Sequence, residues 1–167
     1  MATPAEFAAA TLVVATVSAS LPFFLYGAWI VLREDVVTWR VLVRHLSFIG
    51  VGLGLTTGPI VVWMLPRLLD QLDGFTGLHA FLGFQAYALL VFALTGIVRI
   101  FQVKREHALY HEPDPDIELS ELHEDMDLWR RRLRIGVFGY LTFWLLAWVV
   151  GLARYAVVYD PLGRAGF

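Results

Sequence analysis

Four long apolar runs constrain this chain more than any other feature of its sequence. They extend over residues 7–32, 46–65, 78–100 and 135–156. A helix needs about 20 residues to cross the roughly 30 Å hydrocarbon core of a bilayer, and each run is long enough. None of them alternates apolar and polar residues as the strands of a membrane barrel do. The sequence therefore predicts a multi-pass membrane protein with four transmembrane helices.

The lengths of the connections indicate how these helices are arranged. The connections between the first three runs are short, which favours antiparallel neighbours. No stretch outside the runs is large enough to bury a core of its own. The expected fold is all-α, an up-down-up-down four-helix bundle that forms one transmembrane domain over residues 1–167.

Basic residues predict which side of the membrane each connection faces. Loop one and the flanks of the acidic loop 102–134 carry ten Lys and Arg residues, whereas the opposite side carries three. Basic residues accumulate on the cytoplasmic side of membrane proteins. We therefore expect a cell-membrane protein with both termini outside and with loops one and three in the cytoplasm.

Loop three holds nine of the fifteen acidic residues, and its pattern predicts helix on both sides. The third run continues in helix-compatible sequence to Tyr110, and Asp114–Pro115 is typical of a helix start. The expected structure is a helical hairpin that projects from the cytoplasmic face. Its second helix is either a solvated acidic helix or a docking face for a partner protein. The apolar positions of that face recur every three or four residues: Leu119, Leu122, Met126 and Trp129.

Small residues mark the expected helix contacts. Gly50, Gly54 and Gly58 follow GxxxGxxxG spacing in the second run, and Gly83 belongs to a similar stripe in the third. In lipid, such strips let two helix backbones approach closely. The pattern predicts helix packing at these four glycines, against either the same chain or another copy.

The histidines are the candidate ligands for a cofactor or a metal ion. His45 lies at the cytoplasmic start of the second run and His79 at the external start of the third. About 20 helical residues separate such ends, so the two imidazoles lie roughly a bilayer apart and cannot share one haem. His107 and His111 are four residues apart on one helical face. With Glu112 or His123 they could bind a divalent metal.

Two resemblances accompany these patterns. With its glycine-rich second run and the LHAFLG start of its third, the chain partly resembles six-helix transmembrane b-type cytochromes. That resemblance implies that His45 and His79 would ligate haem b in an electron-transport protein. In composition and layout the chain also resembles small uncharacterised four-span membrane proteins of halophilic archaea, which implies no activity.

The residues needed for most catalytic chemistries are missing from the sequence. There is no cysteine, which excludes disulfides, iron–sulfur clusters and thiolate zinc sites. No phosphate loop or Ser/His/Asp set is present, and the acidic loop is unsuited to nucleic acid. We expect a non-catalytic membrane subunit or scaffold without a cofactor, in a homo-oligomer or a larger, possibly respiratory, complex. Its partners would be membrane lipids and other membrane subunits or copies of itself. The alternatives are a haem b electron carrier and a small transporter or channel, which the broken helices expected at Pro22 and Pro59 would suit.

Overall fold

The computed structural model describes residues 3–34, 38–68, 74–112 and 122–164, and helices account for nearly all of them. Four long helices are each apolar and long enough to cross a membrane. The second of them runs unbroken through a π-helical segment, η1, and a last short turn, α3. The elements are α1 (Pro4–Leu32), α2 (Trp39–Pro59), η1 (Ile60–Met64), α3 (Leu65–Arg67), α4 (Gly74–Glu106), α5 (Met126–Tyr159) and α6 (Pro161–Arg164). The prediction of an all-α, four-helix, multi-pass membrane protein is confirmed.

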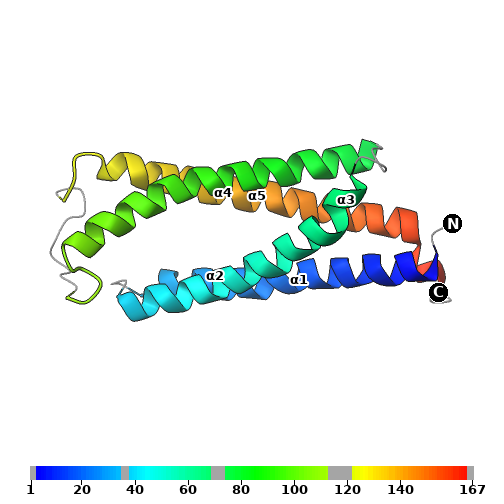
Figure 1. Ribbon diagram of the computed structural model, residues 1–167, viewed down its shortest axis with the longest axis horizontal. Helices are drawn as coiled ribbons and strands as arrows, with labels where there is room; N and C mark the ends of the chain where they lie inside the picture. Colours follow the sequence, from blue (N-terminus) through cyan, green and yellow to red (C-terminus); the bar gives the residue numbers. More distant parts are fainter. Residues whose placement is uncertain (1–2, 35–37, 69–73, 113–121, 165–167) are drawn as a thin grey trace.

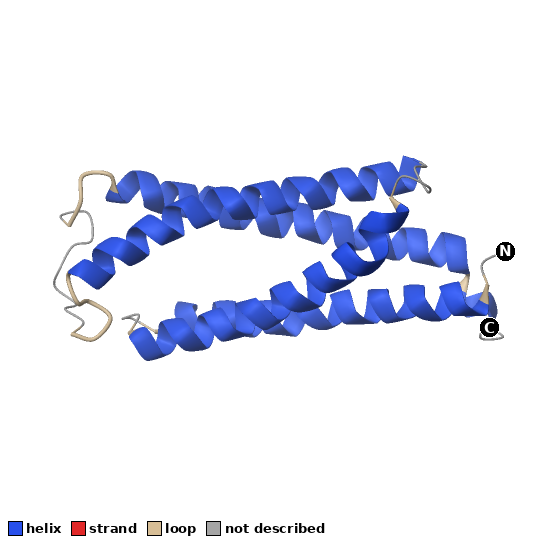
Figure 2. Cartoon of the chain, in the orientation of Figure 1, coloured by secondary structure: helices blue, strands red, loops and turns tan. Residues whose placement is uncertain are grey.

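The four helices form two antiparallel hairpins, α1 with α2 and α4 with α5 (Figures 1 and 2). Packing is extensive within each hairpin and sparse between them. Both termini lie at one end of the bundle, together with α3 and the start of α4. The end of α1 and the start of α2 lie at the other end, with the end of α4 and the start of α5. This is the expected up-down-up-down order.

Glycines allow the two helices of the second hairpin to lie almost backbone to backbone. A Cβ atom added at Gly136 would lie 2.6 Å from the Cβ atom of Ala93 and 2.7 Å from the carbonyl oxygen of Leu89. A Cβ atom added at Gly96 would lie 2.6 Å from the carbonyl oxygen of Trp129. Because backbone atoms cannot rotate away, both positions require glycine for this helix separation.

The first hairpin uses glycine more loosely, against side chains. A Cβ atom at Gly27 would lie 2.8 Å from Ile49, and one at Gly52 would lie 2.9 Å from the Phe24 ring. Phe24 also joins the hairpins, because its ring meets the Trp144 ring edge-on at a centroid distance of 5.7 Å. The central core therefore forms where this aromatic side chain of α1 reaches α5.

The helical hairpin predicted around loop three is shorter than expected. The prediction that helix continues to Tyr110 is wrong, because α4 ends at Glu106 and Ala108 takes a left-handed conformation with φ 55°. This turn ends the helix by hydrogen bonds back to it, including Leu109 N to the Lys104 carbonyl at 3.0 Å. The predicted start at Asp114–Pro115 lies outside the described residues. Residues 122–125 are not helical, and α5 begins at Met126.

The apolar stripe proposed for partner docking packs inside the chain. Met126 is fully buried and Trp129 nearly so, and both pack with Val103 of α4. Leu122 is half-buried against the same cluster, and Leu119 lies outside the described residues. As a correction to the docking hypothesis, α4 itself covers the described part of this stripe, so it offers no free apolar face.

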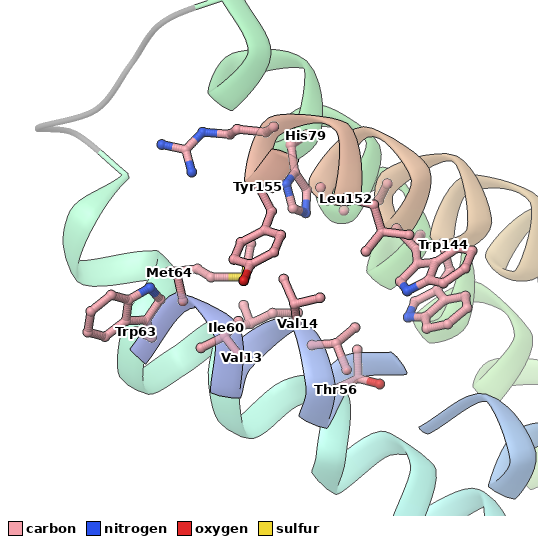
Figure 3. A pocket seen from close by; sticks show the side chains of 18 of the residues that line it. Val13, Val14, Thr56, Ile60, Trp63, Met64, His79, Trp144, Leu152 and Tyr155 are labelled. Carbon is pink, nitrogen blue, oxygen red and sulfur yellow. The ribbon is translucent and has the colours of Figure 1, made fainter. Parts of the chain in front are cut away.

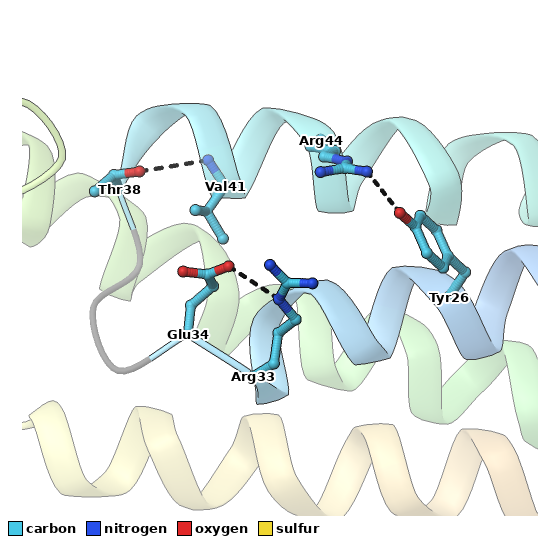
Figure 4. Close-up of polar contacts among 6 residues, drawn as sticks. All are labelled: Tyr26, Arg33, Glu34, Thr38, Val41 and Arg44. Carbon is cyan, nitrogen blue, oxygen red and sulfur yellow. Dashed lines mark hydrogen bonds and ion pairs between the residues drawn. The ribbon is translucent and has the colours of Figure 1, made fainter.

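Aromatic and polar contacts join the two hairpins at the end of the bundle opposite the termini. The backbone N–H of Trp39 donates to the Tyr110 carbonyl at 2.9 Å, and its ring packs near those of Phe101 and Tyr110. Figure 4 shows neighbouring polar contacts in the first hairpin, including the Thr38 cap of α2 and the Arg44–Tyr26 hydrogen bond.

Candidate functional site

A cleft opens between the two hairpins near the end of the bundle that holds the termini (Figure 3). All four long helices contribute to it, and it is partly open to the outside. It exists because the hairpins meet closely around Phe24 and Trp144 but pack sparsely elsewhere. Ligand sites between helices of a bundle are commonly of this kind.

The interior of the cleft is apolar and aromatic. Val13 and Val14 of α1 face Trp144 of α5, and Ile60 and Met64 of η1 close another side. Farther along α4, Gly83 leaves the wall open, since no heavy atom lies within 4 Å of where its Cβ would be. The space is therefore shaped to receive hydrocarbon.

The π-helical segment brings its side chains to the cleft. Pro59 has no N–H to donate, which disrupts α-helical hydrogen bonding just before η1. The Leu65 N–H then bonds the Ile60 carbonyl, five residues earlier. Trp63 and Met64 of η1 line the cleft. Single π-helical turns of this kind occur frequently at functional sites.

The mouth of the cleft is basic. The Arg154 Nε atom donates to the Thr76 hydroxyl at 3.0 Å, which joins α5 to α4. The Arg67 guanidinium lies 3.6 Å from the centre of the Trp63 ring. In the part of the chain that the structure describes, Arg154 lines the cleft, Arg67 lines an adjoining hollow that shares Trp63 and His79 with it, and no Asp or Glu lines either.

His79 is held in the cleft wall by a glycine on the facing helix. A Cβ atom at Gly151 of α5 would lie 2.7 Å from the His79 Cε1 atom. Glycine at that position thus makes room for the imidazole between α4 and α5. Deeper in the bundle, the Thr57 and Tyr87 hydroxyls share a hydrogen bond of 2.7 Å between α2 and α4.

The structure separates the two candidate haem ligands. His45 lies near the start of α2, which is at the opposite end of the bundle, and its Nδ1 atom donates to the Gly27 carbonyl of α1 at 2.8 Å. His79 lines the cleft at the end that holds the termini. The two imidazoles therefore contact different hairpins and do not face each other.

The candidate metal ligands also point to different neighbours. The His107 Nδ1 atom, just past the end of α4, donates to the Val103 carbonyl of α4 at 3.0 Å, whereas the His111 ring lies 6.0 Å from the Trp39 ring. The His123 ring packs on Trp129 at 4.4 Å. Within residues 3–34, 38–68, 74–112 and 122–164, no three His, Asp or Glu side chains gather as metal ligands.

The glycines singled out by spacing do not pack against the rest of the described chain. Gly50, Gly54 and Gly58 are exposed, and no heavy atom within 4 Å would meet a Cβ at any of them or at Gly83. Packing inside the chain uses other glycines, such as Gly52, which the spacing did not indicate. The GxxxGxxxG strip consequently faces away from the rest of the described chain.

Sequence reasoning missed the basic mouth. From the sequence, Arg67 and Arg154 were two of the three basic residues expected on the outer side. A hydropathy profile does not indicate that the helix ends that carry them lie close together. Pro59 was the one available signal, since proline inside an apolar run predicts irregular backbone that is tolerated where it lines a cavity.

Comparison with known proteins gives a family for nearly the whole chain. No curated protein and no solved structure shows significant similarity to it. Residues 6–160 match one family model. The chain therefore belongs to the family described as "Domain of unknown function (DUF7321)".

Proposed function

We propose that this protein is a non-catalytic membrane subunit that pairs with a second copy of itself through the outer face of α2. The proposal rests on the exposed strip of Gly50, Gly54 and Gly58, which has open space where each Cβ would be. Gly52, on the same helix, is turned inward against Phe24. Two sides of α2 therefore carry glycine, but only one of them has a partner within the described chain.

The glycines of the strip destabilise the helix but allow another helix to approach closely. Each glycine in a helix interior is about 1 kcal/mol less favourable than alanine. At a lipid-facing position, no close contact within the same chain offsets that cost. A strip of glycines four residues apart does permit close approach of another helix backbone, which drives association in lipid, where apolar burial does not.

A second copy is the partner that the strip suits best. A two-fold axis brings the same strip of both copies together, and a strip of glycines without protruding side chains can pack on its own copy. In the orientation that we propose, with both termini outside, the strip crosses the middle of the bilayer. A different membrane subunit of a larger complex is the competing occupant.

Substitution on the strip tests this assembly. Gly54→Leu should weaken self-association at least tenfold in lipid bicelles, measured by energy transfer between separately labelled copies. Val91→Leu is the matched control, because Val91 is 61% exposed and lies on α4, outside the strip and outside α2. Energy transfer that is absent in the unmodified protein, or equal in Gly54→Leu, would refute pairing through α2. Loss of a different co-purifying subunit in Gly54→Leu would assign the strip to a larger complex instead.

The rival proposal, a haem b electron carrier, draws support from His79 in an apolar cleft with aromatic walls. It requires a reduced-minus-oxidised α-band in protein purified from its native membrane. That band should vanish in His79→Ala. The subunit proposal expects no band in either protein.

A further inference from the structure

The cleft between the hairpins plays no part in the assembly proposed above, and it has distinct chemistry at its two ends. Its depth is formed by apolar and aromatic side chains, among them Val14, Trp144 and Trp148. His79 and Arg154 line both this space and the adjoining hollow that carries Arg67, and these basic side chains form the mouth. Such a site matches a molecule that is hydrocarbon at one end and acidic at the other.

The cleft is also continuous with the lipid-facing surface. Leu65 of α3 and Phe84 of α4 line its side, and these side chains are 48% and 58% exposed. Between them the missing side chain of Gly83 leaves the wall of α4 open. A lipid in the surrounding bilayer could therefore enter sideways, between the two hairpins, without passing through water.

The charges at the mouth select the head group. Guanidinium groups bind carboxylate and phosphate oxygens through several donors at once. The carboxylate of Glu6 at this end of the bundle accepts from the backbone N–H of Thr3 at 2.8 Å, and it also interacts electrostatically with Arg67. Among the described lining residues the charged side chains are arginines, which offer donors to an anionic head group and disfavour a cationic one.

We propose that this cleft is a binding site for one anionic lipid. An acyl chain lies between the hairpins against Trp144 and Trp148, and the carboxylate or phosphate head lies beside Arg67 and Arg154. A fatty acid and a phospholipid share this chemistry, and the assay below separates them. A lipid bound there would fill the space between the two hairpins, which otherwise pack sparsely against each other.

Tryptophan fluorescence provides the assay, because Trp63, Trp144 and Trp148 line the cleft. Delipidated full-length protein in detergent is titrated with brominated stearic acid, brominated phosphatidylglycerol or the uncharged brominated stearyl alcohol. Bromine quenches tryptophan at short range. The proposal expects saturable quenching by at least one of the anionic probes, with half-saturation at about tenfold lower concentration than for the alcohol. Whichever anionic probe binds more tightly identifies the source of the head group.

Two matched glycine variants locate the binding. Gly83→Leu places a side chain in the cleft and should abolish the saturable component. Gly77→Leu on the same helix adds the same atoms in equally open space, and Gly77 is absent from the described cleft lining, so it should bind as the unmodified protein does. Far-UV circular dichroism checks that both variants are folded. Equal quenching in the two variants would overturn the site, and equal affinity for the alcohol and the acids would overturn the anionic head. Gly54→Leu should leave quenching unchanged, so this proposal and the pairing proposal can fail separately.

Discussion

The close packing of α4 on α5 leads to a quantitative prediction for the substitution Gly136→Ala. The added Cβ would lie 2.6 Å from the Ala93 Cβ and 2.7 Å from both the Ala93 nitrogen and the Leu89 carbonyl oxygen. Two of these obstacles are backbone atoms, so no rotamer change can relieve the contact. The helices themselves must separate.

The size of the effect follows from that separation. Restoring the closest pair to 3.4 Å, the lower limit of ordinary contact, needs the helices to move apart by about 0.8 Å. A gap of that order forfeits a quarter to a half of the dispersion attraction between the atoms it separates. Overpacking of this kind costs about 1–3 kcal/mol. Alanine also gains about 1 kcal/mol of helix propensity over glycine, which offsets part of the cost.

A control cancels the propensity gain. Gly54→Ala makes the same chemical change in a helix, but no heavy atom lies within 4 Å of its Cβ position. The free energy of unfolding, measured by titration with sodium dodecyl sulfate and far-UV circular dichroism, should be about 1–3 kcal/mol lower for Gly136→Ala than for Gly54→Ala. Measurements are made at a protein dilution where the chain is monomeric. Equal stabilities would refute backbone-to-backbone packing at this glycine.

The same unfolding measurement checks three further predictions. Gly52→Ala should be less stable than Gly50→Ala, because its Cβ meets the Phe24 ring at 2.9 Å whereas Gly50 faces open space; the reverse order would mean that α2 is rotated. Met126→Ala should lose about 2–5 kcal/mol, since this side chain is fully buried outside the membrane-crossing runs, and a loss below 1 kcal/mol would contradict its burial. Burial raises the pKa of the Tyr110 hydroxyl above its ordinary value of 10.0, so the folded state holds this proton longer than the unfolded state. Its contribution to stability is complete below pH 10 and is lost as the pH rises through the folded pKa, a decline that Tyr110→Phe should reduce in an alkaline titration.

Some features of the fold could be read from the sequence because the bilayer imposes them. The number of helices, their order and the placement of both termini at one end follow from four apolar runs and short connections. Helix ends were less predictable. Hydropathy marks only the apolar part of a helix, whereas α4 and α5 extend well beyond it to Glu106 and from Met126.

The candidate site shows where sequence reasoning stops. His79 was identified as a residue at a helix start, but only the structure places it in a cleft beside Gly151 and at the same mouth as Arg154. These residues are far apart in the sequence. Their meeting depends on how one hairpin sits on the other, and no short motif carries that information.

The sequence by itself determined that the chain crosses a membrane four times, because burying about 20 apolar residues per helix leaves few alternatives. Only the tertiary structure decided which side of each helix faces protein. Lipid tails and a helical core are both apolar, so a transmembrane helix has no hydrophobic stripe that distinguishes its inner from its outer face. For this reason the sequence did not indicate that Gly50, Gly54 and Gly58 face outward while Gly52 packs inside. The cleft between the hairpins likewise became visible only in the tertiary structure.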